Sequence, residues 1–264
     1  MNGSIQRRVF LCASLAALLY APSVAAPPIS ASEKQPVLVE LFTSEGCSSC
    51  PPADRVAIGL QSEPDLDVII LGEHVDYWNY LGWRDQYSSN QFSNRQHDFA
   101  RSLGQQSVYT PQVVVDGRYG MNGSQREAIR SAVKKASQST KASLNISAQT
   151  SGKNPSSKLI TIRTSCPSSL GSIRAHLFVA VTENNLKSSV RSGENGGSVL
   201  EHTGVVRCLR KVGEVVITDE RKPFSLTVDL ELDPKWRKPN LRIVAFLQDA
   251  STMVIRGANQ IEVD

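Results

Sequence analysis

The chain has 264 residues, five cysteines and a formal net charge of +4 at pH 7. Its length favours two domains or one large domain. The basic residues are scattered, and they are not interleaved with aromatic residues as in modules that bind nucleic acids. We therefore expect no nucleic-acid partner, and the small net charge by itself indicates no class of ligand.

Residues 1–25 have the pattern of a signal peptide. Arg7 and Arg8 precede an apolar stretch from Val9 to Ala21, and Ser23-Val24-Ala25 supplies the small residues of a cleavage site. The stretch is too short to span a bilayer, and no later segment approaches 18 apolar residues. We expect a periplasmic or secreted protein without stable membrane insertion after cleavage. The arginine pair leaves both ordinary secretion and twin-arginine export open.

The segment 36–138 alternates between strand and helix patterns. Val37 to Phe42 is an apolar, β-rich run that predicts a first strand, and residues 65–75 predict a second strand covered on both faces. The other predicted elements are a helix over 52–61, a helix over 88–103 opening with Ser88 and Gln91 in capping-box spacing, a strand over 110–117 closed by an Asp-Gly turn, and a helix opening with Ser124 and Glu127 in the same spacing.

This order of elements is the thioredoxin pattern, so we predict an α/β thioredoxin-like N-terminal domain over residues 36–138. From about residue 141 the pattern changes to short alternating β runs separated by polar turns, with no long helix between them. Such runs favour antiparallel strands with one buried face. We therefore predict an all-β sandwich domain over residues 142–264, joined to the first domain by the segment 137–141.

Two cysteines lie where the first predicted strand gives way to a helix, in the run Gly-Cys-Ser-Ser-Cys-Pro at residues 46–51. At a helix start, unpaired N–H groups and the helix dipole favour a thiolate at Cys47. A thiolate is the attacking species in disulfide exchange, and Cys50 is placed to resolve a mixed disulfide at Cys47. We expect Cys47 to be the more exposed and more acidic thiol. The same spacing also occurs as half of a zinc site.

His74 ends the second predicted strand. In parallel strands of one sheet, the carboxyl ends meet at one edge, so we expect His74 to lie on the same edge as Cys47. That position suits proton transfer to a thiolate, or a third metal ligand beside Cys47 and Cys50. Asp76 is placed to orient the imidazole in either role. A histidine hydrogen-bonded in the loop, with neither role, fits the same position.

Three motifs together resemble the domain of unknown function 1223 family of secreted proteins. They are LFTSEGCSSCPPAD at residues 41–54, HVDYW at 74–78 and YTPQ at 109–112. The run from Thr110 to Gly117 also resembles the glutaredoxin signature around its cis-proline. The resemblance covers nearly all of the mature chain and implies a redox centre made of Cys47, Cys50 and Pro111. It also implies a cis bond before Pro111, with Thr110 offering backbone groups to a substrate strand.

Cys166 and Cys208 lie in the β-rich region, away from any predicted helix start. In a compartment that permits disulfides, we expect them to form a structural disulfide that closes a long loop. The glycine-rich run from Arg191 to Gly197 follows no strand-to-helix crossover, so we interpret it as a turn between strands rather than a phosphate loop.

Two functions from different classes fit these residues. The first is a thiol-disulfide oxidoreductase without a cofactor, in which Cys47 attacks, Cys50 resolves, and the partner is a protein thiol or disulfide. The alternative is a chaperone for a soft metal such as copper, held by Cys47, Cys50 and His74. A third hypothesis places binding in the β region and leaves the thiols without a role.

Overall fold

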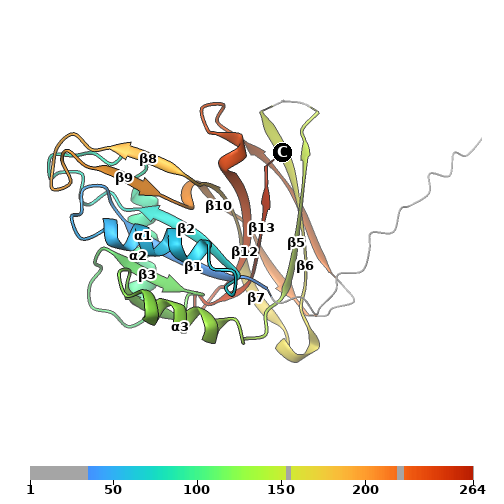
Figure 1. Cartoon of the computed structure of the whole chain (residues 1–264). Coiled ribbons are helices and arrows are strands. Elements are labelled where there is room, and N and C mark those ends of the chain that lie inside the picture. Colours follow the sequence, from blue (N-terminus) through green and yellow to red (C-terminus); the bar gives the residue numbers. More distant parts are fainter. Residues whose placement is uncertain (1–34, 153–155, 219–222, 264) are drawn as a thin grey trace, which may run out of the picture.

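The computed structural model describes residues 35–152, 156–218 and 223–263, and the predicted signal peptide lies outside these ranges. An eight-stranded mixed sheet extends through both halves of the chain, with strand order β13-β12-β7-β10-β2-β1-β3-β4 (Figure 1). In chain order its strands are β1 (Val37–Thr43), β2 (Val68–His74), β3 (Gln112–Val115), β4 (Tyr119–Asn122), β7 (Ile173–Glu183), β10 (Val205–Ile217), β12 (Leu241–Asp249) and β13 (Ile255–Glu262).

Helices cover both faces of the half of this sheet built from β1 to β4. Successive strand residues point to opposite faces, so Leu41 packs with α1 (Pro51–Gln61) and α3 (Arg126–Ala136), whereas its neighbour Phe42 packs with α2 (Asn90–Ser102). This is why β1 and β2 are buried along their whole length. The arrangement brings the start of α1 to the carboxyl ends of β1 and β2.

Two smaller sheets complete the described chain. The first joins β5 (Ser143–Thr150), β6 (Ser157–Ser165) and β11 (Phe224–Glu231), and it packs over the β7, β10, β12 and β13 part of the large sheet around an aliphatic core. The second is the hairpin of β8 (Leu186–Ser189) and β9 (Val199–His202). This hairpin lies beside α1, so the second half of the chain reaches the start of that helix (Figure 1).

The predicted fold class, an α/β thioredoxin-like N-terminal domain followed by an all-β sandwich domain, is wrong. Strand β2 is not the edge of a separate α/β sheet, because β10 pairs with it in parallel at Val205 and Gly72. The amide of Gly72 also donates to the carbonyl of Gly204 at 2.7 Å. The strands expected in two domains therefore form one mixed, mostly antiparallel sheet, and the chain is mainly β.

The helices form close to their predicted positions, but their caps differ. Ser89, not Ser88, caps α2 by accepting a hydrogen bond from the amide of Gln91. The hydroxyl of Ser88 instead donates to the carbonyl of Asp85 at 2.8 Å. Helix α3 begins after Gln125 and has no side-chain cap. In the described ranges, no helix has the length and apolar character needed to cross a bilayer.

Candidate functional site

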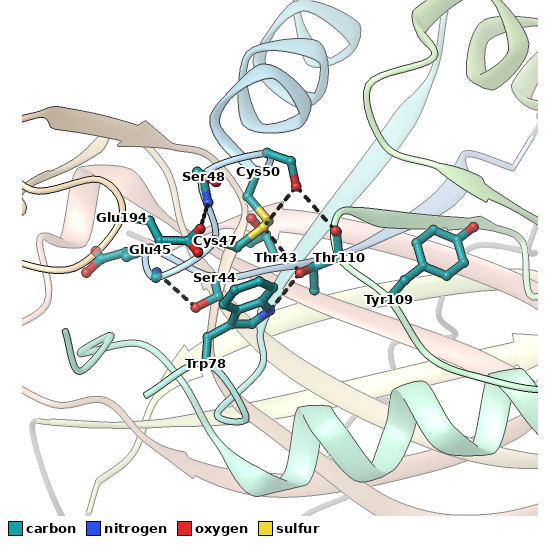
Figure 2. The surroundings of a disulfide bond; sticks show 12 residues. Thr43, Ser44, Glu45, Cys47, Ser48, Cys50, Trp78, Tyr109, Thr110 and Glu194 are labelled. Atoms are coloured by element: carbon teal, nitrogen blue, oxygen red, sulfur yellow. Dashed lines mark hydrogen bonds between the residues drawn. A yellow bond between two sulfur atoms is a disulfide. The ribbon is translucent and has the colours of Figure 1, made fainter. Parts of the chain in front are cut away.

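Cys47 and Cys50 form a disulfide at the start of α1 (Figure 2). Pro51 and Pro52 occupy the first helical positions, where a missing N–H costs no intrahelical hydrogen bond. The Thr110-Pro111 peptide bond is cis, as predicted. The fold thus brings the Cys47–Cys50 pair and Thr110-Pro111 together, from two segments that lie far apart in the sequence.

The expectation that Cys47 is the more exposed thiol is wrong for this disulfide state, because both cysteines are 0 % exposed. The amides around the pair are also occupied. The amide of Cys47 donates to the carbonyl of Ser44, and the amide of Cys50 donates to the carbonyl of Cys47. The amide of Ser48 donates to the carboxylate of Glu194 at 3.0 Å. Side chains therefore have to supply most of the polar contacts to the sulfur atoms.

Two hydroxyl groups contact Cys47 Sγ, each at 3.3 Å. One is Ser49 Oγ and the other is Thr110 Oγ1. Trp78 Nε1 donates to the same Thr110 oxygen at 2.8 Å, and an indole N–H can only donate. Thr110 must therefore accept from Trp78, which leaves its own hydrogen directed at Cys47 Sγ (Figure 2). This arrangement favours negative charge on that sulfur.

A loop from the second half of the chain covers the disulfide. The β8–β9 loop, residues 190–198, carries Glu194, which accepts from Ser48, and Asn195, whose Nδ2 donates to the carbonyls of Glu45 and Cys47 at 2.8 and 3.0 Å. Figure 2 shows Glu194 next to Ser48. The interpretation of this glycine-rich run as a turn between strands is confirmed. The sequence did not indicate that the turn lies on the cysteines.

The aromatic loop that follows β2, residues 77–84, closes the other side of the site. Trp78 bonds to Thr110, and Trp83 Nε1 donates to Glu45 Oε2 at 2.7 Å. A side chain at Gly46 would lie 3.2 Å from Trp78 Cβ, so the loop packs tightly on the residues that precede Cys47. Tyr80 points outward and is 81 % exposed. The tryptophans therefore contact the residues around the disulfide, whereas Tyr80 faces solvent.

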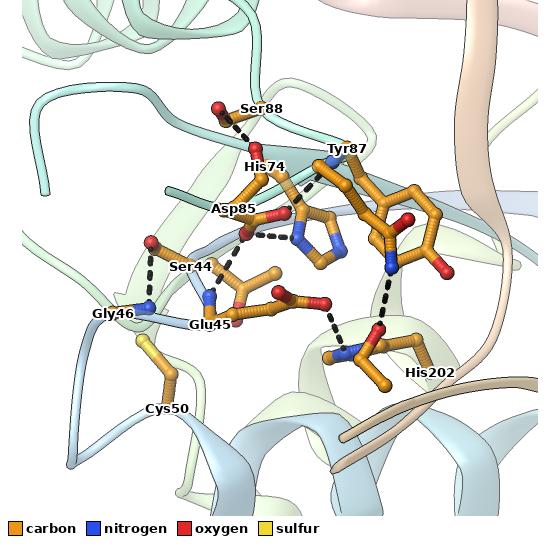
Figure 3. Close-up of polar contacts among 12 residues, drawn as sticks. Ser44, Glu45, Gly46, Cys50, His74, Asp85, Tyr87, Ser88 and His202 are labelled. Carbon is orange, nitrogen blue, oxygen red and sulfur yellow. Dashed lines mark hydrogen bonds and ion pairs between the residues drawn. The ribbon is translucent and has the colours of Figure 1, made fainter. Parts of the chain in front are cut away.

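A group of buried ionisable side chains lies beneath the disulfide, and we call it the acid–histidine cluster (Figure 3). Asp85 Oδ2 accepts from the amide of Glu45 at 2.8 Å and lies 2.6 Å from His74 Nδ1. His202 Nδ1 lies 3.3 Å from an Asp54 oxygen, and His202 Nε2 lies 3.6 Å from Glu45 Oε1. The members of the cluster, each less than 9 % exposed, are Glu45, Asp54, His74, Asp85 and His202.

The charges of this cluster depend on one another. Burial lowers the pKa of His202, but its contacts with Asp54 and Glu45 outweigh burial and raise the pKa to about 10. Burial raises the pKa of Asp85, and the neighbouring His74 together with two backbone amides brings it below its usual value. At neutral pH the cluster therefore holds a protonated His202 between carboxylates.

His74 lies in this cluster rather than against the sulfur atoms. Its ring is oriented by Asp85, whereas the predicted partner Asp76 accepts from Ser93. No hydrogen bond joins His74 to Cys47 or Cys50 in the described residues. The described ranges also contain no group of three or more His, Cys, Asp or Glu side chains arranged to hold a metal ion. The ligand set proposed for copper is therefore not assembled in the disulfide form.

The predicted disulfide between Cys166 and Cys208 is not formed in the structure. The two cysteines lie on different layers: Cys166 follows β6 of the three-stranded sheet, and Cys208 lies at a register shift in β10 of the large sheet. The Cys166 thiol donates to the carbonyl of Gly171 at 3.0 Å. Cys208 is half-buried, and burial raises the pKa of its thiol.

Several residues of the site were not predicted. Glu45 and Asp54 lie within the quoted cysteine motif, so their position next to the thiols was a usable signal. Glu194, Asn195 and His202 carried no local signal, because they reach the site through long-range contacts of the second half of the chain with α1 and β2.

The site is therefore a covered disulfide at a helix start, on a mixed sheet that both halves of the chain complete. Residues 38–248 match the family described as Protein of unknown function (DUF1223), and the chain belongs to this family. The comparison with curated proteins gave no match.

Two solved structures resemble the chain over most of its length. The crystal structure of protein AGR_C_4864 from Agrobacterium tumefaciens is 28% identical, with a TM-score of 0.67, and the match covers 89% of this chain and 97% of that chain. HBP35 of Porphyromonas gingivalis is 20% identical, with a TM-score of 0.68, and the match covers 89% of this chain and 77% of that chain. The second likeness concerns the fold alone.

Proposed function

We propose that this protein is a periplasmic or secreted thiol-disulfide oxidoreductase that uses the Cys47–Cys50 pair. The observation that carries the proposal is the hydroxyl of Thr110, which Trp78 orients toward Cys47 Sγ. That hydrogen bond favours the thiolate of Cys47 and supports its role as the sulfur that exchanges with a partner. Cys50, buried behind it, resolves the mixed disulfide.

The reaction follows thiol–disulfide exchange. A partner thiolate bonds to Cys47 Sγ, the Cys47–Cys50 bond breaks, and Cys50 leaves with the electron pair. The second partner thiol then displaces Cys47, so that the partner is oxidised to a disulfide and the pair gains two electrons. In the reverse direction the Cys47 thiolate attacks a partner disulfide, and Cys50 resolves the mixed disulfide by attacking Cys47 Sγ, so that the pair is oxidised and the partner gains two electrons. Pro111 and Thr110 flank the Cys47 side, and His74 acts on the site through Asp85.

The burial of both cysteines supports a selective partner. A protein thiol or disulfide reaches Cys47 only after the β8–β9 loop moves, because Glu194 and Asn195 occupy backbone groups of the cysteine loop. A partner that replaces these contacts with its own opens the site faster than an unrelated small thiol, which reacts only when the loop lifts by itself.

Graded reduction of the purified protein with dithiothreitol, followed by acid quenching, alkylation and mass mapping, tests the proposal. We expect the Cys47–Cys50 pair to open and close reversibly while the protein stays folded. Cys50→Ser should trap partners through Cys47, and the double variant Cys166→Ser, Cys208→Ser should behave like the wild type. A pair that stays closed in excess reductant, or equal trapping by Cys47→Ser, would contradict the assignment.

Thr110 provides a sharper control on the chemistry. Thr110→Val keeps the shape but removes the O–H that points at Cys47, so the thiol pKa of Cys47 should rise by about one unit. Thr110→Ser should retain the wild-type value. The readout is the pH dependence of Cys47 alkylation in the Cys50→Ser background.

Copper analysis of the reduced protein tests the alternative function, a copper chaperone. Copper retained by the wild type and lost with His74→Gln would favour the chaperone.

A further inference from the structure

His202 reaches the disulfide site from the opposite half of the chain. It is the last residue of β9, and its side chain is 1 % exposed beneath α1. One ring nitrogen faces Asp54 at 3.3 Å and the other faces Glu45 at 3.6 Å. Its ring also packs edge-on against His74 and Tyr87, at centroid distances of 4.9 and 6.0 Å (Figure 3). These four side chains are the titratable groups that surround it.

Two polar atoms of this contact lack a hydrogen bond within the described residues, namely Glu45 Oε1 and His202 Nε2. Buried polar atoms are usually paired, and unpaired ones cluster where a group changes its charge or partner. The fully buried Glu45 carboxylate and the buried Asp54 carboxylate need a cation, and His202 is the cation that the site provides.

Asp54 connects this cluster to Cys50. The amide of Asp54 donates to the carbonyl of Cys50 at 3.2 Å, so the two residues are one helical turn apart. Side chains four residues apart lie on the same helix face, so Asp54 and Cys50 share one face at the start of α1. A thiolate released at Cys50 is buried, and the buried carboxyl groups of Glu45 and Asp54 belong to the loop before it and to the next helical turn. Both burial and like charge disfavour that thiolate, so Cys50 has to take up a proton when the disulfide opens.

We propose that His202 is a positioning residue that holds, between Asp54 and Glu45, the proton that Cys50 takes up when the disulfide opens. This inference rests on the proposed function. When a partner thiolate bonds to Cys47, Cys50 leaves as a thiolate, and one proton passes from His202 to its sulfur through the Asp54 carboxyl. On closure, Cys50 attacks Cys47, the partner thiolate leaves, and the proton returns to His202. No further oxidant or reductant is required.

Opening rates across pH test this role. Dithiothreitol opens the pair, and acid quenching followed by alkylation gives the rate from pH 6 to about pH 10.5. His202→Gln keeps a hydrogen-bonding side chain but carries no proton, so we expect it to open about tenfold more slowly at pH 7, the equivalent of one pKa unit. The difference should vanish above about pH 10, where wild-type His202 loses its own proton. A merely structural histidine would slow opening equally at every pH.

His176→Gln is the matched control, because His176 on β7 pairs with Glu214 on β10, outside the site. It should leave the profile unchanged. Asp54→Asn should reproduce the His202→Gln profile, because it breaks the same proton path.

A wild-type measurement covers the case in which the variants do not fold. The imidazole resonances of His202, followed by NMR against pH, should give different pKa values in the oxidised and reduced protein, because Cys50 shares the proton only after reduction. Equal values in a pair that opens normally would overturn the role of His202 alone. A pair that never opens would overturn the proposed function and this inference together.

Discussion

Arg95 on α2 is the centre of a second buried charge group, away from the disulfide. Its guanidinium binds both oxygens of Glu40, at 2.5 and 3.0 Å, and its Nε lies 3.3 Å from Glu73. The rings of Phe99, Phe178 and Phe246 surround it. One cation thus faces two carboxylates. Burial raises the pKa of Glu73 well above its usual value, the neighbouring Glu40 raises it further, and Arg95 opposes both.

This shift predicts how the stability of the protein depends on pH. Between pH 4.5 and the higher pKa of the folded state, folded Glu73 binds a proton that the unfolded chain has released. The contribution of Glu73 to the free energy of unfolding is therefore fully present at low pH. It decreases as the pH rises through this window, so the protein becomes less stable. Glu73→Gln cannot ionise, so it should remove that part of the pH dependence and raise stability at pH 8 relative to the wild type.

Urea denaturation at several pH values measures this effect. Glu40→Gln is the matched variant, because it removes the bidentate partner of Arg95 and should cost about 3–5 kcal/mol, as breaking a buried ion pair does. If Glu73→Gln instead destabilises the protein at pH 8 as much as Glu40→Gln does, then Glu73 is ionised in the folded state and the assigned direction of its pKa is wrong.

The residues found from the sequence alone are those whose chemistry depends on local spacing. Cys47 and Cys50 were recognisable because C-x-x-C follows a strand and precedes a helix, and Pro111 because its strand has a familiar signature. We predicted Asp76 as the partner of His74 because the two residues are close in the sequence. The fold of the aromatic loop instead brings Asp85 to the His74 ring.

At the scale of elements, the β8–β9 loop packs on the residues around the disulfide, and we expect it to limit access to the sulfur atoms. Asn195 makes two hydrogen bonds to carbonyls of the cysteine loop and is itself buried. Asn195→Ala removes both, and two neutral hydrogen bonds are worth about 1–3 kcal/mol together. We expect dithiothreitol to open the Cys47–Cys50 pair about 5- to 150-fold faster in this variant, because the loop lifts more often.

Mass mapping after timed reduction gives these rates. Asn94→Ala on the exposed face of α2 is the control, since the Asn94 side chain donates to Asn90 Oδ1, one turn earlier in the same helix and away from the site. If Asn195→Ala opens at the wild-type rate while remaining folded, the loop is not the barrier to reduction, and reductant reaches the sulfur atoms from the side of the aromatic loop.

The helices and the first strands were predictable because each carries its own periodic pattern, and α1, α2 and α3 form close to their expected positions. The position of the β8–β9 loop was not predictable. The glycines between these strands indicate a turn, but they do not indicate which residues the turn contacts. The contacts of Glu194 and Asn195 exist only because β9 lies beside α1.

At the scale of the whole molecule, the continuity of the large sheet decided the fold and could not be inferred. The apolar run of β2 correctly indicated that both its faces are covered, but it carries no information on which strand pairs with its edge. One core cluster combines Leu38 and Ile69 of the first half with Val244 and Phe246 of the second. The second half thereby supplies part of the core of the first, as well as His202 and the loop over the cysteines.

Gly204 makes this junction possible, and it yields a prediction for the whole fold. Its φ is +59°, and a Cβ there would lie 2.4 Å from the carbonyl oxygen of Ile70 on β2. Gly204→Ala should cost about 2–6 kcal/mol, because backbone strain and steric overlap each cost about 1–3 kcal/mol. Gly104→Ala is the control: its φ is +66° with nothing within 4 Å, so only the strain remains.

Hydrogen exchange monitored by mass spectrometry shows where the stability is lost. Because β10 pairs with β2 and the two halves share a core, Gly204→Ala should weaken protection in β1 and in β12 to the same extent, in one cooperative transition. Gly104→Ala should reduce protection less, and mainly near the end of α2. If Gly204→Ala loosens β12 while β1 keeps wild-type protection, the two halves unfold independently. The strands would then form one sheet without unfolding as one cooperative unit.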